Sequence, residues 1–145
     1  MRALLQRVSE ASVSVDGEVV AQINAGLLVL LGIYPDDGRA EIDYLVDKLL
    51  GLRIFPDDSK PMNRSVTDID GGVLVVSQFT LAADTSRGRR PGFSNAAPPE
   101  IAEPLYEEFL ETLGQRWPQT KAGIFGADMQ VALINDGPVT ILLER

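Results

Sequence analysis

A Gly-Pro step near the end of the chain constrains the fold more than any other feature of the sequence. Gly137 and Pro138 separate two apolar runs. Proline donates no ladder hydrogen bond and glycine adds no packing surface, so the pair is expected at a turn or where bare backbone is needed. Because an X-Pro bond is cis in only about 5 to 6% of cases in folded proteins, the step by itself favours a hairpin turn. The two strands of that hairpin are predicted at residues 126–135 and 138–144.

The composition predicts one domain, residues 1–145, in a soluble cytoplasmic protein. A chain of 145 residues with 45% hydrophobic content can build one sizeable core. Its 21 acidic and 13 basic residues give a net charge of −8, which repels nucleic acid at long range. DNA is therefore not expected as a partner, and any RNA contact must be local. No apolar run reaches the length of a membrane span, and charges at the start of the chain argue against a signal peptide.

The chain contains no histidine and no cysteine, which removes whole classes of chemistry. Ser-His-Asp and Cys-His nucleophilic sites cannot form, and neither can zinc sites that depend on imidazole or thiolate. Catalysis would have to use carboxylates, a hydroxyl, Lys or Tyr, a carboxylate-bound metal, backbone N–H groups, or a group on the substrate itself.

The first third of the chain reads as strands followed by a helix. Residues 4–15 alternate loosely, Asp16-Gly17 is a two-residue hairpin signal, and residues 19–23 form the returning strand. Residues 27–33 predict a buried central strand. The helix is expected at residues 39–52, where apolar side chains recur on one face. The apolar face of this helix is formed by Ile42, Leu45, Val46, Leu49 and Leu50.

The middle of the chain contains an acidic, turn-rich segment between two short strands. Residues 53–55 and 73–76 are the expected strands, and the second runs directly into a polar stretch that begins at Ser77. Polar side chains at the end of a buried strand are candidates for a functional site. The acidic residues between the strands are Asp57, Asp58, Asp68 and Asp70. Their spacing lacks the glycine and the terminal glutamate of a calcium loop, which favours solvated charges over a metal site.

A second amphipathic helix is expected at residues 101–113, after an irregular segment that carries a basic cluster. Its apolar stripe is predicted from Ile101, Leu105, Phe109 and Leu113. The order of strands and helices indicates a mixed α/β protein. We expect three layers, in which two packed, mostly antiparallel or mixed sheets are covered by both helices on one side.

Two segments read together resemble the D-aminoacyl-tRNA deacylases, a family that edits mischarged tRNA. They are Ser77-Gln78-Phe79-Thr80-Leu81 and Asn135-Asp136-Gly137-Pro138-Val139-Thr140. The resemblance covers essentially the whole chain. It implies a deacylase fold, chiral proofreading of D-aminoacyl-tRNA by ester hydrolysis, and a homodimer whose active site forms at the interface.

The resemblance also implies that the Gly137-Pro138 bond is cis and enters the partner's pocket. Main-chain carbonyls of Gly137 and Pro138 would then exclude L-aminoacyl groups, so that chirality is read by backbone. Arg7 matches the arginine that braces this peptide in the family, and its fork of donors suits carbonyl oxygens. Since glycine has no side chain on either face, glycyl-tRNA, including that mischarged on tRNA(Ala), is expected to enter.

The catalytic residues that the resemblance implies are Ser77, Gln78, Phe79 and Thr80. Main-chain N–H groups near Gln78 and Phe79 would form an oxyanion hole. Thr80 is the obvious candidate nucleophile, but apart from Lys or an N-terminal amine the chain has no residue type that commonly activates a threonine. The resemblance favours substrate assistance, in which the 2′-hydroxyl of the terminal adenosine helps to activate water. No cofactor and no metal are expected.

Further residues are predicted to hold the 3′ end of the tRNA. Phe125 and Met129 match the family's pocket wall, where they could contact the adenine by stacking and through sulfur. The cluster Arg87, Arg89 and Arg90 could meet phosphates near the acceptor end, which gives affinity without sequence reading.

Two other functions remain open at the level of sequence. The protein could be a dimeric scaffold or peptide-binding module, in which the Gly-Pro step is only a turn and residues 77–81 offer a sheet edge. It could also be a metal-dependent hydrolase that uses the four aspartates of the acidic segment.

Overall fold

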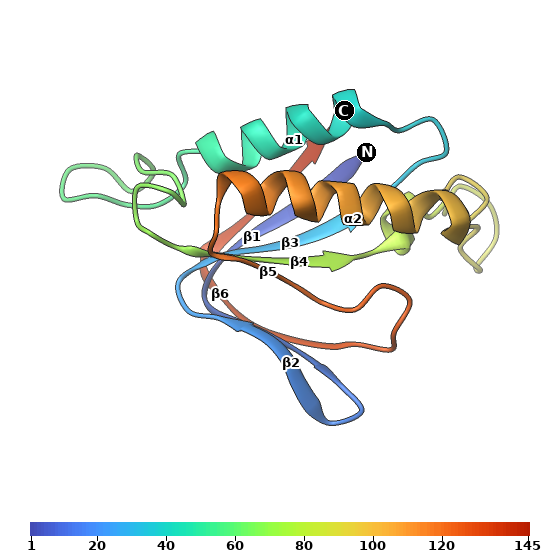
Figure 1. The fold of residues 1–145 in the computed structure, drawn as a ribbon, viewed down its shortest axis with the longest axis horizontal. Helices are drawn as coiled ribbons and strands as arrows, with labels where there is room; N and C mark the ends of the chain where they lie inside the picture. The colour runs from blue at the N-terminus through green and yellow to red at the C-terminus, as the bar shows by residue number, and fades with distance from the viewer.

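The computed structural model describes residues 1–145, which form one six-stranded sheet and two long helices (Figure 1). The elements are β1 (Arg2–Val15), β2 (Glu18–Ile23), β3 (Gly26–Gly32), α1 (Arg39–Gly51), β4 (Gly72–Ser77), the 3-10 turn η1 (Phe79–Ala82), α2 (Pro99–Arg116), β5 (Thr120–Ala122) and β6 (Gln130–Glu144). Neither helix has the length and the apolar composition that crossing a membrane requires.

Strand β1 is central to the sheet because it pairs with three other strands, β2, β3 and β6. The strand order is β2-β1-β3-β4-β5, and β6 also pairs with β1. The first half of β1 pairs with β3 and its second half with β2, both antiparallel. Strands β3, β4 and β5 run parallel to one another. The predicted mixed α/β class is confirmed, and the two expected sheets are continuous with each other through β1.

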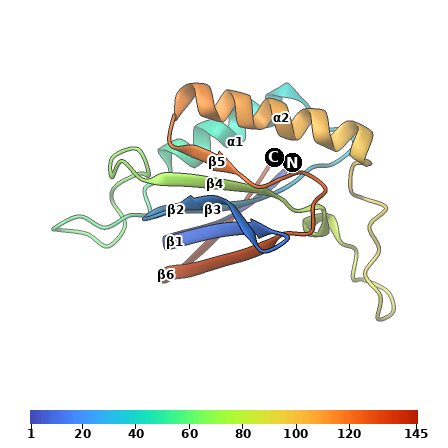
Figure 2. The ribbon, with the colours of Figure 1, turned by 60° about the horizontal axis from the view of Figure 1, so that its bottom comes forward.

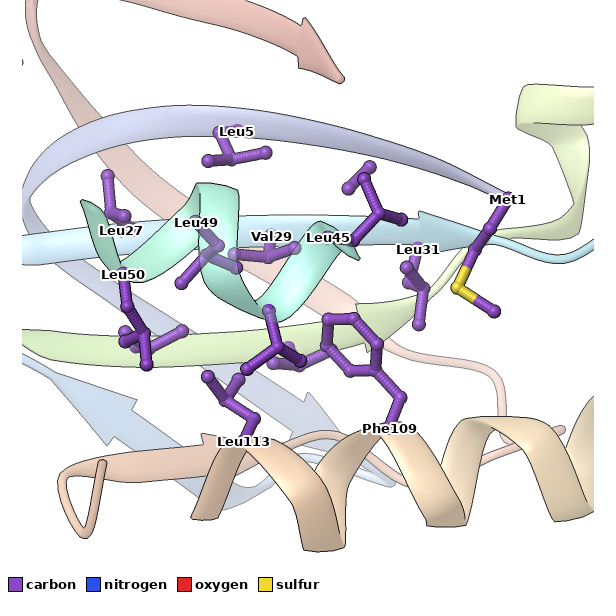
Figure 3. Packing of buried hydrophobic residues seen from close by; sticks show 14 of the residues in the cluster. Met1, Leu5, Leu27, Val29, Leu31, Leu45, Leu49, Leu50, Phe109 and Leu113 are labelled. Carbon is purple, nitrogen blue, oxygen red and sulfur yellow. The ribbon is translucent and has the colours of Figure 1, made fainter. Parts of the chain in front are cut away.

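Both helices cover one face of the sheet, as predicted, and β6 runs beside β1 at the edge of the same sheet (Figure 2). The larger core fills the space between helices and sheet, where Leu27 and Leu31 of β3 meet Leu49 of α1 and Phe109 of α2 (Figure 3). A smaller core, which includes Leu28, lies on the other face. Because side chains alternate along a strand, the uninterrupted apolar run of β3 supplies both cores.

The helix α1 agrees with its prediction, whereas the buried face of α2 differs. The apolar face predicted for α1 is fully buried. In α2 the buried residues are Ala102, Tyr106, Phe109, Thr112 and Leu113, while Ile101 is 38% exposed. A stripe of residues four apart drifts about 40° around the helix at each step, because 3.6 residues make one turn. Ile101, the first member of the predicted stripe, is thereby rotated off the core, whereas Leu105 is partly buried against it.

The predicted C-terminal hairpin is wrong. Strand β6 is continuous through Gly137 and Pro138, and both of its halves pair with β1 rather than with each other. Residues 53–55 do not form a strand either, since only a single bridge joins Phe55 to Arg64. The short strand β5 was not predicted.

Truncating single side chains of α2 should distinguish the buried face that the structure shows from the face predicted by the sequence. Phe109→Ala should lower the free energy of unfolding by about 3 to 5 kcal/mol, because it empties a fully buried site. Ile101→Ala on the same helix should cost about 1 kcal/mol or less. Urea denaturation at one protein concentration measures both values, and equal losses would contradict the assigned face.

Candidate active site

A cleft of about 680 Å³ opens where β4 ends and η1 begins. One wall contains Ser77, Gln78 and Phe79, and another contains Phe125 and Met129. The fold therefore brings together two of the predicted groups of site residues. Of the 17 residues that line the cleft, 12 are hydrophobic, and none carries a titratable side chain.

The main chain at the end of β4 is only partly free to bind a ligand. The Gln78 N–H donates to the carbonyl of Leu31 at 2.7 Å and thus extends the sheet. Within η1 the first donor is Leu81 N–H, which bonds to the Gln78 carbonyl at 3.2 Å. The N–H groups of Phe79 and Thr80 precede this first turn and are not used by it. Of the two N–H groups expected to bind the substrate oxygen, that of Gln78 is therefore engaged in the sheet, whereas that of Phe79 is not.

Phe79 and Thr80, the first two residues of η1, are exposed beside the cleft. The Thr80 hydroxyl accepts a hydrogen bond of 2.6 Å from the Gln78 side-chain amide. An amide NH₂ group is a donor only, so it cannot take a proton from the hydroxyl. The ring of Phe79 contacts that of Phe93, with ring centroids 5.0 Å apart in an edge-to-face arrangement. Phe93 lines the same cleft, and its place was not predicted.

Tyr106 of α2 supports the wall opposite β4. Its ring lies 5.7 Å from that of Phe125, and its hydroxyl donates to the carbonyl of Val75 at 3.1 Å. The same carbonyl accepts the N–H of Gly123, just before the Phe125 wall. Burial raises the pKa of Tyr106 well above its usual range, because the ionised phenol would lose its hydration. Tyr106 is therefore a neutral support and not a base. Sequence analysis missed it, since a tyrosine on a helix carries no distinguishing signal.

Gly137 and Pro138 lie away from the cleft of their own chain and are exposed. Their peptide bond is cis, as the family resemblance implies. They belong to a wide bulge in the β1–β6 pairing. Val8 pairs with Asn135 and Gln6 pairs with Thr140, so that four residues of β6 stand opposite the single residue between Gln6 and Val8.

Arg7 is that single residue, and its buried guanidinium holds the start of the bulge. Its Nε donates to the carbonyl of Asp136 at 2.8 Å, and a terminal nitrogen donates to the carbonyl of Ile54 at 2.6 Å. Arg7 therefore contacts the predicted segment. It bonds the carbonyl that precedes Gly137, rather than the carbonyls of Gly137 and Pro138.

The position of Gly137 has no room for a side chain. Its φ is +144°, and a Cβ built there would lie 2.7 Å from a methyl carbon of Val139 and 3.1 Å from the Arg7 guanidinium. Only glycine fits between these two side chains.

Arg87, Arg89 and Arg90 lie on an exposed loop that leads to Phe93. The loop is closed by a bridge between Asp84 and Gly92. None of the three arginines takes part in an ion pair within the chain. Their charges are therefore not neutralised by ion pairs within the chain.

The aspartates of the acidic segment act mainly as acceptors within their own loop. Asp57 accepts the side-chain amide of Asn63 and the N–H groups of Ser59 and Lys60, which together hold its pKa well below the usual value. Asp68 accepts the N–H of Ser65 in the same way, and its pKa is also lowered. No group of three or more acidic side chains in the chain is placed to hold a metal ion.

Comparison with known proteins gives one consistent family. The model of the D-Tyr-tRNA(Tyr) deacylase family matches residues 4–144. The D-aminoacyl-tRNA deacylase of Roseiflexus castenholzii is 61% identical over 99% of this chain and 92% of its own length. That of Prosthecochloris aestuarii is 58% identical over 99% of both chains.

Two solved structures have the same fold. A c-Myc DNA unwinding element binding protein is 46% identical, with a TM-score of 0.95 over 100% of this chain and 99% of its own. A probable eukaryotic D-amino acid tRNA deacylase has a TM-score of 0.83 at 18% identity, over 98% and 97% of the two chains. With a family match over nearly its full length and relatives of this identity, the chain belongs to the D-Tyr-tRNA(Tyr) deacylase family and is an enzyme that hydrolyses D-aminoacyl-tRNA.

Proposed function

We propose that the cleft beside η1 is the active site, and that it hydrolyses the ester with groups from the main chain and the substrate. One observation carries this proposal: no titratable side chain lines the cleft, while two unused N–H groups lie at its mouth. The enzyme removes D-amino acids from tRNA in the cytoplasm, where aminoacyl-tRNA is made and used.

The N–H groups of Phe79 and Thr80 bind the oxygen of the ester carbonyl. This oxygen becomes negatively charged as water adds, and fixed donors stabilise the charge without reorganising. Loss of one such donor typically costs about 2.7 to 4 kcal/mol of transition-state stabilisation. An aminoacyl ester is already activated, so this contribution is a large share of the catalysis required.

The base comes from the substrate. The hydroxyl of Thr80 has only an amide donor beside it, which leaves it unactivated. The 2′-hydroxyl of the terminal adenosine is adjacent to the ester. It accepts a proton from the attacking water and passes its own proton to the departing 3′-oxygen, so that the C–O bond breaks to leave a free 3′-hydroxyl and the carboxylic acid. The protein supplies orientation and oxyanion stabilisation.

A homodimer brings Gly137 and Pro138 of one subunit to the cleft of the other. Their exposure and their distance from the lining of their own cleft support an action in trans. The exposed apolar side chains Ile134 and Leu142 on β6 are suited to an interface between subunits. The carbonyls of Gly137 and Pro138 occupy the space that the side chain of an L-aminoacyl group needs, whereas D-aminoacyl and glycyl groups enter.

The 3′ end of the tRNA binds along the remaining walls. Phe125 and Met129 are half-buried in the cleft lining and contact the adenine. Arg87, Arg89 and Arg90 attract phosphates of the acceptor end. With a net charge of −8 on the whole chain, this attraction remains local and salt-sensitive.

Purified protein should hydrolyse D-aminoacyl-tRNA and glycyl-tRNA, including glycyl-tRNA(Ala), but leave L-aminoacyl-tRNA intact. The reason is that only the L side chain meets the two carbonyls. Release of labelled amino acid from D-, L- and glycyl-tRNA, compared with buffer alone, measures this. Equal rates for the D and L forms would refute the proposed filter, and complete exclusion of glycyl-tRNA would contradict a filter made of backbone.

Thr80→Ala should retain most of the deacylase activity, because the threonine contributes its N–H and not its hydroxyl. A tRNA that ends in 2′-deoxyadenosine should not be deacylated by the unchanged protein, since it lacks the assisting group. Single-turnover rates on both substrates test the two statements together. Normal turnover of the deoxy substrate would rule out substrate assistance.

Gly137→Ala should lower kcat/KM for D-aminoacyl-tRNA by about tenfold or more, which corresponds to about 1.4 kcal/mol. The added methyl group would displace Val139 or the guanidinium of Arg7. Gly17→Ala is the matched control, because its φ is also positive at +82° but no atom lies within 4 Å of the new Cβ. Activity of the Gly137 variant equal to that of the control would argue against the proposed role.

A further inference from the structure

The side chain of Asn135 spans the bulge that contains Gly137 and Pro138. Its Oδ1 accepts the N–H of Val139 at 2.8 Å, and its Nδ2 donates to the hydroxyl of Thr140 at 2.9 Å. Asn135 is the last residue of β6 paired with β1 before the bulge, and Thr140 is the first paired after it. One side-chain amide thus joins the two ends of the four-residue bulge.

This contact replaces hydrogen bonds that the sheet cannot provide. Four residues of β6 face one residue of β1, so the middle of the bulge has no regular ladder partners. Pro138 has no N–H to donate. Arg7 fixes the carbonyl of Asp136 at the start of the bulge, and Asn135 fixes the N–H of Val139 at its end.

No side chain of the chain donates to the carbonyl of Gly137 or Pro138, so these groups depend on the ends of the bulge for their direction. A peptide plane moves as a unit. If the N–H of Val139 turns, the carbonyl of Pro138 in the same plane turns with it. The Asn135 amide therefore controls the direction of a carbonyl that it does not touch.

We propose that Asn135 is a positioning residue of the chirality filter, which sets the direction of the Pro138 carbonyl and thereby the discrimination between D- and L-aminoacyl-tRNA. The inference rests on the proposed function of Gly137 and Pro138. Thr140 secures Asn135 in turn, because its hydroxyl also accepts a hydrogen bond of 3.3 Å from Gln6 of β1.

A loss of this contact should affect specificity more than stability. Asn135 is half-buried and Thr140 is exposed, so water can satisfy the groups that the substitution frees. The pairing of β1 with both halves of β6 does not require the side chain of Asn135.

Asn135→Ala should lower the ratio of kcat/KM for D- over L-aminoacyl-tRNA by about tenfold, mainly through faster hydrolysis of the L substrate. The ratio is measured with both substrates in one preparation, so it does not depend on the folded fraction. Asn135→Asp should keep a ratio near that of the unchanged protein, because its two oxygens can accept the N–H of Val139 and the hydroxyl of Thr140. Asn24→Ala, on an exposed turn outside the site, controls for the substitution itself.

An unchanged ratio in Asn135→Ala would overturn the inference, and so would equal falls in both rates, which would indicate a general structural role. If Asn135→Ala yields no folded protein, Thr140→Val decides. That variant removes one of the two contacts and should lower the ratio by a smaller factor, whereas an unchanged ratio would overturn the inference. Failure of the unchanged protein to discriminate D from L would instead refute the proposed function, which is a separate outcome.

Discussion

The buried guanidinium of Arg7 is the interaction on which the arrangement of this protein depends. A buried cation is tolerated only where acceptors surround it, and Arg7 finds them on two elements that are distant in sequence. It bonds the carbonyl of Ile54, which belongs to the larger core, and the carbonyl of Asp136 at the start of the bulge in β6. The exposed Gly137-Pro138 segment is thereby connected to the larger core, although neither residue is buried.

A site made from main chain depends on the sheet for its accuracy. The N–H of Gln78 donates to the Leu31 carbonyl of β3, and this bond fixes the direction of the following N–H groups, those of Phe79 and Thr80. The carbonyl of Val75 accepts bonds from Tyr106 and Gly123, which ties α2 and the Phe125 wall to the same strand. Because no titratable side chain lines the cleft, the placement of these backbone groups is the main contribution that the chain can make to the proposed chemistry.

Features set by neighbouring residues could be predicted from the sequence, and features set by distant contacts could not. The apolar period of α1, the unbroken run of β3 and the Asp16-Gly17 turn are local signals, and each gave the correct element. Gly137-Pro138 has the same local signature in a hairpin and in a bulged strand. What distinguishes them is the pairing of both halves of β6 with β1, at the other end of the chain. The free donors at Phe79 and Thr80 likewise depend on a bond from Gln78 to β3.

In the proposed filter the groups that exclude an L side chain are carbonyls, which every residue has, so a substitution damages the filter by displacing the backbone and not by removing a functional group. The proposed filter depends on the direction in which these carbonyls point. Within the bulge the peptide planes lack ladder partners, so their direction is determined by what holds the two ends. The start is held by a buried charge from β1, and the end by a half-buried amide from β6 itself. These two supports differ in what their loss should do. Removing Arg7 leaves the buried carbonyl of Ile54 without this donor and should affect folding as well as the proposed filter, whereas the role proposed for Asn135 concerns only the direction of the filter.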